Sequence, residues 1–274
     1  MSYLLAEKGS LKAMWETINA KDSFGRGEAL GRHFLAIPLV KHLIVLSEGL
    51  QVNGSDLASG LREVLGEDIS VTGGLAGDHS RFKNTCVIDE DGKASENVLF
   101  AHALVGEEWK IHFGSMGGWN TFGLERQVTR SKENVVYEID HQPALDLYKY
   151  YLGKRSAELP ASGLLFPLSM RMNAEDPPLV RTILSVNEKE KSLTFAGDIP
   201  QGSFVKLMKA NIDRLIDGAG NAALIAIEHA NNPPELALLV SCVGRRLVLR
   251  QLAEEELEEV QDQLNAGLQI GFYS

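Results

Sequence analysis

One short stretch combines a cysteine with two arginines. In "SCVGRR", residues 241–246, Cys242 lies three positions before Arg245. A neighbouring arginine favours the reactive thiolate form of a cysteine. A catalytic cysteine also needs a base, and no histidine lies nearby in the sequence. We weigh three roles for this stretch: a ligand-facing turn formed by Ser241, Cys242 and Arg245, a half-buried structural cysteine, and a nucleophile, which ranks last.

A second stretch is rich in glycine. Gly73, Gly74 and Gly77 follow a short β-type run and precede Asp78. A dinucleotide-binding loop needs G-x-G-x-x-G spacing and a helix whose first amides face the phosphates. The spacing is absent, turn and strand residues follow Asp78, and no P-loop lysine follows a glycine loop. Two interpretations remain: a tight turn with close backbone packing, or a small-molecule pocket lined by Gly73, Gly74 and Asp78.

A third stretch, "HFGSMGGWNTFG", places Gly117, Gly118 and Trp119 after a predicted strand. Glycines beside an aromatic ring commonly line pockets for flat or apolar ligands. The same residues also suit an ordinary wide turn covered by a tryptophan. Arg126 and Arg130 follow at strand spacing, so either could bind a carboxylate or pair with a structural acid.

The histidines do not predict a metal site. None of the seven has the H-E-x-x-H or C-x-x-C context that presents several ligands on one face. Haem needs only one axial histidine, so histidine spacing leaves haem possible. No cofactor is therefore expected, with haem as the open alternative.

Two strand–helix–strand units must position these stretches. The first spans residues 43–74 and the second residues 236–272, and each has an apolar run, a helix pattern and a second strand. Such crossovers join parallel strands and are right-handed. Because both units end in turns rich in glycine and serine, we expect those turns to meet at the rim of one shared cavity.

The remaining pattern is mixed. Helical spacing of apolar residues predicts a helix over residues 10–20, and Ser203 is read as the cap of a helix that ends at Gly218. Alternation predicts one hairpin over residues 98–113 and another that turns at residues 131–134. This combination predicts an α+β or mixed α/β fold with two related halves, whose mixed sheets are covered by helices and each hold one crossover unit.

Linker chemistry at residues 157–163, "AELPASG", places a boundary between a first part, residues 1–156, and a second part, residues 157–274. The length of 274 residues allows two such parts.

Composition limits the class of partner. The net charge of −10 argues against nucleic acid, which needs clustered lysine and arginine. No apolar run approaches the length of a membrane span, and residues 1–15 lack the pattern of a signal peptide. Only Cys86 and Cys242 occur, which suggests a reducing compartment. We therefore expect a cytoplasmic protein with neither nucleic-acid nor membrane partners.

Several blocks together resemble the FIST family, in both its N- and C-terminal parts. They are "VLSEGLQVNGSDLASGL", "VTGGLAGDHSRFKNT", "GSMGGWNTFGLERQVTRSKENVVYEIDHQPALDLYKYYLG", "LPASGLLFPL", "TFAGDIPQGSFVKLMKANIDRLIDGA", "LLVSCVGRRLVL" and "GFYS". The resemblance covers roughly residues 25–274. It implies that residues 1–156 form the FIST N-terminal part without the family's usual front segment. Residues 157–274 would form the C-terminal part and end before its usual last turn.

The resemblance implies sensing rather than catalysis. Family members are signal-transduction modules proposed to bind small ligands such as amino acids, and bacterial members work beside signalling proteins such as histidine kinases. A subgroup binds haem and senses nitric oxide, and a eukaryotic relative carries the fold on an F-box protein. The leading hypothesis is therefore a cytosolic small-ligand sensor that signals to a partner kinase. The alternatives are a haem-binding nitric-oxide sensor, an interaction scaffold without ligand and, last, a Cys242-dependent enzyme.

Overall fold

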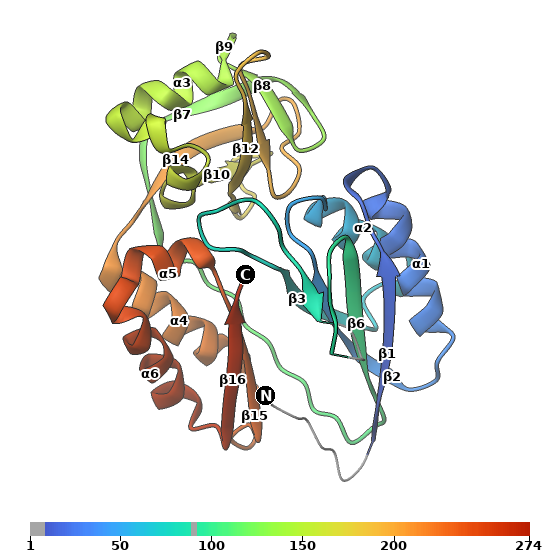
Figure 1. Ribbon diagram of the computed structural model, residues 1–274. Coiled ribbons are helices and arrows are strands. Elements are labelled where there is room, and N and C mark those ends of the chain that lie inside the picture. Colours follow the sequence, from blue (N-terminus) through green and yellow to red (C-terminus); the bar gives the residue numbers. More distant parts are fainter. Residues whose placement is uncertain (1–8, 89–91) are drawn as a thin grey trace.

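The chain folds into three parts that meet at the centre of the molecule (Figure 1). Figure 1 shows the computed structural model, which describes residues 9–88 and 92–274. The sequence interpretation of residues 1–15 rests partly on residues 1–8, which lie outside the described residues. The three parts are named here the N-terminal layer, the central sheet and the C-terminal layer.

The N-terminal layer is a four-stranded sheet with two helices on one face. Its strands lie in the order β1-β6-β2-β3, and β2 and β3 are parallel. Helices α1 and α2 bury Phe34 and Leu61 against Leu43 and Ala101 of the sheet. The bounds are β1 Ser10–Thr17, a 3-10 turn Ala20–Asp22, α1 Ser23–Leu35, β2 Val40–Ser47, α2 Gly54–Leu65, β3 Ser70–Leu75, a short pair β4 Val87–Ile88 and β5 Ala94–Ser95, and β6 Val98–Val105.

The central sheet has eight strands and one packed helix. Its order is β11-β10-β14-β7-β8-β13-β12, with β9 paired to β8. Helix α3 buries Leu145 and Tyr148 against Ile183 and Phe195 of the sheet. The bounds are β7 Trp119–Lys132, β8 Val135–Ile139, β9 Gln142–Pro143, α3 Ala144–Leu152, 3-10 turns Gly153–Glu158 and Ala161–Leu165, β10 Leu168–Arg171, β11 Leu179–Arg181, β12 Ile183–Asn187, β13 Ser192–Phe195 and β14 Phe204–Ala210.

The C-terminal layer pairs two parallel strands with three helices. Strand β15 pairs with β16 from Leu236 to Ser241, and α4 and α6 bury Ala223 and Val260 against them. The bounds are α4 Ile212–Ile227, β15 Leu236–Ser241, α5 Val243–Leu249, a 3-10 turn Arg250–Leu252, α6 Ala253–Leu264 and β16 Leu268–Tyr273.

Both crossover units, the mixed four-stranded sheet and the hairpin turn at residues 131–134 agree with the sequence interpretation. The central sheet draws β7–β9 from residues before position 156 and β10–β14 from residues after it. The two parts expected from the sequence therefore share one hydrophobic core at this sheet.

Three predicted elements are wrong. Residues 10–17 form β1 rather than a helix, because they pair along their whole length with β6. Residues 204–210 form β14, between β10 and β7, and the helix starts only after Asn211, whose side chain caps Arg214 N at 3.1 Å. In both segments the apolar spacing fits a strand as well as a helix.

The third error is the return strand of the first hairpin. Residues 107–118 have no regular structure and cross instead from the N-terminal layer to β7. They pack on α4 at Gly114 and Gly118, where an added Cβ would lie 2.0 Å from Ala222 O and 2.2 Å from Arg214 O. Glycine is needed at both positions because the backbones approach so closely.

Candidate functional site

A cavity of about 330 Å³ lies where the three parts meet. In Figure 1 the end of β16, beside the letter C, lies close to the loop that follows β3. We name it the junction cavity. It is lined by Gly49, Leu50, Leu75, Ala76, Gly77, Asp78, His79, Phe82, Thr85, Leu164, Thr182, Leu184, Ala196, Val240, Ser241, Cys242, Val243 and Ser274.

The carboxyl ends of the two crossover units lie side by side and form adjacent parts of the cavity wall. Ser274 Oγ, just past β16, donates a hydrogen bond to Leu75 O at the end of β3, at 2.6 Å. A Cβ at Gly74 would lie 2.9 Å from Val240 Cγ1, so β3 lies directly against β15. The two turns therefore meet at one cavity, as the sequence predicts, and this is the usual place for ligands in parallel sheets.

The N-terminal wall is held by two buried carboxylates. Glu48, 2% exposed, accepts hydrogen bonds from Thr85 Oγ1 at 2.9 Å, Leu50 N at 3.1 Å and Gln51 N at 2.5 Å. Thr85 Oγ1 in turn accepts from Gly49 N at 2.8 Å. The carboxylate of Glu48 thus fixes the turn after β2 and joins this turn to the loop that contains Thr85.

Asp78 fixes the loop that follows β3. It is 7% exposed and accepts from the backbone N–H groups of Phe82, Lys83 and Asn84 at 2.9, 2.8 and 3.3 Å. Burial raises the pKa of this carboxyl, but the three backbone donors outweigh it and hold the pKa below its usual value. Asp78 is therefore ionised at neutral pH, and its oxygens already serve the loop.

The C-terminal wall is held by a buried ion pair. Arg245 Nη1 lies 2.7 Å from Glu256 Oε1, and the two side chains are 10% and 3% exposed. Ser241 Oγ donates to both Glu256 oxygens at 3.1 Å, and Arg245 Nη2 donates to Met116 O at 3.3 Å. Glu256, on α6, thereby fixes the turn between β15 and α5 that presents Cys242 to the cavity.

The central sheet completes the cavity wall and contacts the N-terminal layer through the same residues. Ala196, which lines the cavity, accepts from Gly54 N at 3.2 Å. Asn53 Nδ2 donates to Asp198 Oδ1 at 2.6 Å, beside Asp56. Burial and the neighbouring Asp198 raise the pKa of Asp56 above its usual value. The segment from Ala196 to Asp198 therefore both lines the cavity and contacts the N-terminal layer.

The predicted site residues divide into two groups. Asp78, Ser241 and Cys242 line the junction cavity. Gly73 and Gly74 lie just before it and serve packing: a Cβ at Gly73 would lie 1.8 Å from Val45 O, and Gly74 faces β15. Gly73 and Gly74 therefore allow close backbone packing, and the residues that follow them, Gly77 and Asp78, line the cavity.

The other predicted residues lie outside the cavity lining. Gly117 and Gly118 belong to the segment on α4, and Trp119 packs with a small cluster that includes Leu249. Arg130 pairs with Glu138 at 2.9 Å on the exposed β7–β8 hairpin. Arg245 is committed to Glu256, so neither predicted arginine faces the cavity.

Sequence reasoning missed the contribution of the central sheet. Leu164, Thr182, Leu184 and Ala196 complete the cavity, and nothing in their local sequence marks them. Gly49 could have been found, because it follows β2 at the carboxyl end of a parallel strand, where ligands gather.

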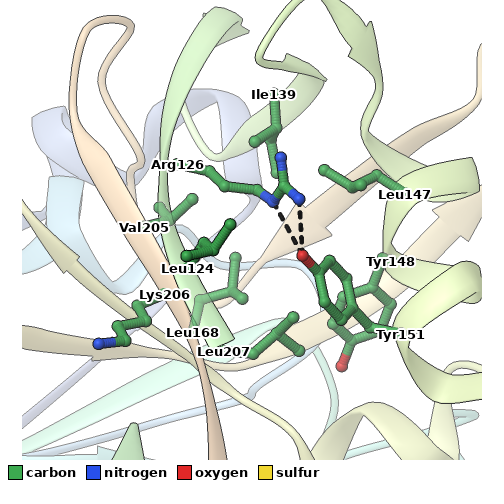
Figure 2. Close-up of a pocket in the computed structure, with 10 residues that line it drawn as sticks. All are labelled: Leu124, Arg126, Ile139, Leu147, Tyr148, Tyr151, Leu168, Val205, Lys206 and Leu207. Carbon is green, nitrogen blue, oxygen red and sulfur yellow. Dashed lines mark hydrogen bonds between the residues drawn. The ribbon is translucent and has the colours of Figure 1, made fainter. Parts of the chain in front are cut away.

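A second hollow lies in the central sheet, but it is far smaller. Figure 2 shows Arg126, whose Nε and Nη2 donate to Tyr151 Oη at 3.0 and 2.7 Å. Its Nη1 donates to Asp140 Oδ2 at 2.7 Å. The volume of about 20 Å³ suits a single water, so this crevice serves to anchor α3 to β7.

No group of three or more His, Cys, Asp or Glu side chains within residues 9–88 and 92–274 could hold a metal ion. In the same part of the chain, no helix has the length and apolar character needed to cross a bilayer.

Comparison with known proteins assigns both parts of the chain. The FIST N domain matches residues 3–142 and the FIST C domain matches residues 144–274. An uncharacterized protein of Methanocaldococcus jannaschii is 25% identical over 212 residues, which is 72% of this chain and 40% of that protein. The chain thus spans less than half the length of this relative. No solved structure matches. FIST domains are sensory domains of signal transduction, and this chain, matched by both of their halves, belongs to the FIST family.

Proposed function

We propose that this protein is a cytoplasmic sensory module that binds a small molecule in the junction cavity and passes the signal to a partner such as a histidine kinase. The family supports the sensory role. The main support for this binding site is that both crossover units meet at one cavity of about 330 Å³. This volume lies at the lower end of the usual range for ligand pockets.

The lining indicates what kind of ligand would fit. Aliphatic side chains such as Leu75, Leu184 and Val240 supply most of the wall, and hydroxyl groups such as Thr182 supply polar contacts. A ligand with a short aliphatic body and one polar head matches this arrangement. Amino acids, which the resemblance implies, therefore belong in any screen together with small amines, alcohols and acids.

Binding at this place would couple directly to the arrangement of the parts. The cavity is built from all three of them, and Ala196 both lines it and contacts Gly54 of the N-terminal layer. A ligand that prefers one arrangement of the layers shifts the population toward it. The surface that changes would then be read by the partner.

The alternatives have less support from the cavity. Its volume suits a molecule smaller than haem, and His79, the histidine in its lining, is exposed on the loop after β3. A nucleophilic Cys242 would need a base, and no side chain of the described residues is hydrogen-bonded to its sulfur. We therefore treat the protein as a binding module rather than an enzyme.

A thermal-shift screen tests the proposal. We expect at least one small molecule to raise the melting temperature saturably, because a ligand that binds only the folded state stabilises it. Leu184→Trp fills the cavity and should abolish the shift. Leu224→Trp, on the exposed face of α4, is the matched control and should keep it. Equal shifts in both variants, or none in the wild type, would refute the proposed site.

A further inference from the structure

Among the described residues, no lysine or arginine lines the junction cavity. The titratable side chains of the lining are those of Asp78, His79 and Cys242. This differs from the sequence interpretation, in which Arg245 belongs to a ligand-facing turn and Arg130 could bind a carboxylate. The charges near the cavity therefore decide which polar head it accepts.

Two buried carboxylates on the N-terminal wall, Asp78 and Glu48, are 7% and 2% exposed. Neither forms an ion pair within the described residues. Their partners are backbone N–H groups and the Thr85 hydroxyl, which stabilise a carboxylate without cancelling its charge. Glu48 lies one hydrogen bond behind the lining, since Thr85 joins it to the cavity at 2.9 Å.

The nearest arginines offset these charges only in part. Arg245 is neutralised by Glu256 at 2.7 Å. Arg181, next to Thr182, is not part of the lining; it donates to Asp198 O at 2.8 Å and to Ser55 Oγ at 3.4 Å, and the carboxylate of Asp198 lies close enough to offset its charge. Arg81 donates to the backbone oxygen of Asp78 at 3.1 Å, and its charge helps to lower the pKa of the Asp78 carboxyl. Because Arg81 is exposed, water screens this charge in part, and Glu48 has no such neighbour among its hydrogen-bond partners.

We infer that the junction cavity selects ligands whose polar head is positively charged or uncharged, and discriminates against carboxylates and phosphates. The inference rests on the proposed function and names its ligand class. A buried negative charge near the site repels an anion more strongly than it would in water, because the effective dielectric constant is lower there. The aliphatic body of the ligand would lie against Leu75, Leu184 and Val240.

Three probes with one carbon skeleton test the inference: isopentylamine, isopentanol and isovalerate. Each is titrated into the full chain at constant pH and ionic strength, and the apparent Kd is taken from the rise in melting temperature. We expect the amine and the alcohol to bind and the acid to bind at least about tenfold more weakly than the amine. Leu184→Trp should remove the shift for every probe.

Glu48→Gln separates charge from shape. Glutamine keeps the size of the side chain and an acceptor for the Thr85 hydroxyl, but its NH2 group would face the Gln51 N–H that now donates to the carboxylate. We expect the folded variant to melt at a lower temperature, so each shift is measured from the variant's own melting temperature. We expect the ratio between the Kd values of acid and amine to fall severalfold, while the Kd of the alcohol stays within about twofold. A ratio unchanged from the wild type would overturn the role of Glu48.

The outcomes distinguish the inference from the proposed function. Tighter binding of isovalerate than of isopentanol, abolished by Leu184→Trp, would overturn the inference and leave the cavity as a binding site. Shifts that are equal in the wild type and in Leu184→Trp would come from nonspecific binding and would overturn both. A library screen whose only saturable ligands are anions would also overturn the inference.

Discussion

Removal of Glu256 should destabilise the C-terminal layer strongly. Its carboxylate is the partner of Arg245 at 2.7 Å and of the Ser241 hydroxyl at 3.1 Å. Glu256→Ala leaves the arginine buried without a counter-charge, and its Nε already has no hydrogen-bond partner in the described residues. The turn that presents Cys242 to the junction cavity would lose its support as well.

The magnitude follows from the burial of the pair. Loss of one partner of a buried ion pair costs about 3–5 kcal/mol, because the remaining charge is uncompensated. The side chains of Arg245 and Glu256 are only 10% and 3% exposed, so we expect the full range to apply. The adjacent Glu255 is exposed in the first turn of the same helix, and Glu255→Ala should cost about 0.3–1 kcal/mol.

Urea denaturation of the wild type and the two variants gives the free energies of unfolding. A third variant, Arg245→Met with Glu256→Leu, removes both charges and should recover most of the stability lost in Glu256→Ala. The reasoning is refuted if Glu256→Ala costs no more than Glu255→Ala, or if the double variant is less stable than Glu256→Ala alone.

Two further predictions concern packing and pH. Gly118→Ala should destabilise the protein by about 1–3 kcal/mol, because its Cβ would meet Arg214 O at 2.2 Å. The neighbouring Gly117 has open space around it, so Gly117→Ala should change the free energy of unfolding by less than about 0.5 kcal/mol; equal losses would contradict the packing account. Burial lowers the pKa of His42 from 6.5 to about 4. The folded pKa lies below the unfolded value, so the stability from neutral His42 is present above pH 6.5 and is lost as pH falls toward 4. Between pH 7 and 5 that loss should be about 2 kcal/mol. His42→Gln should lower the pH dependence of unfolding by this amount, and an unchanged dependence would refute the shift.

The sequence contained enough information for the two crossover units. In residues 43–74 and 236–272, apolar runs, helix caps and terminal glycines all agree, and the structure has parallel strands in both. Such agreement between local signals is what makes an element predictable. The same sequence signals correctly predicted that Asp78 and Cys242 line one cavity.

The sequence predictions were wrong where the spacing of apolar residues fits both a helix and a strand. They were incomplete where contacts between distant segments determine the structure. Leu11, Met14 and Trp15 fit a helix by spacing, but pairing with β6 makes residues 10–17 a strand. The central wall of the cavity could not be predicted, because Thr182 and Leu184 reach it only through the eight-stranded sheet. Arg245 has the chemistry of a carboxylate ligand in sequence, yet its acid lies eleven residues later on α6.

The most direct test of the central claim is an NMR titration of the isotope-labelled protein with the best stabilising molecule from the screen. Gly77 and Cys242 line the junction cavity from different crossover units, the first unit and the second. The account predicts that both signals shift saturably and give one common Kd. Saturable binding that shifts residues elsewhere and leaves both of these amides unchanged would contradict it.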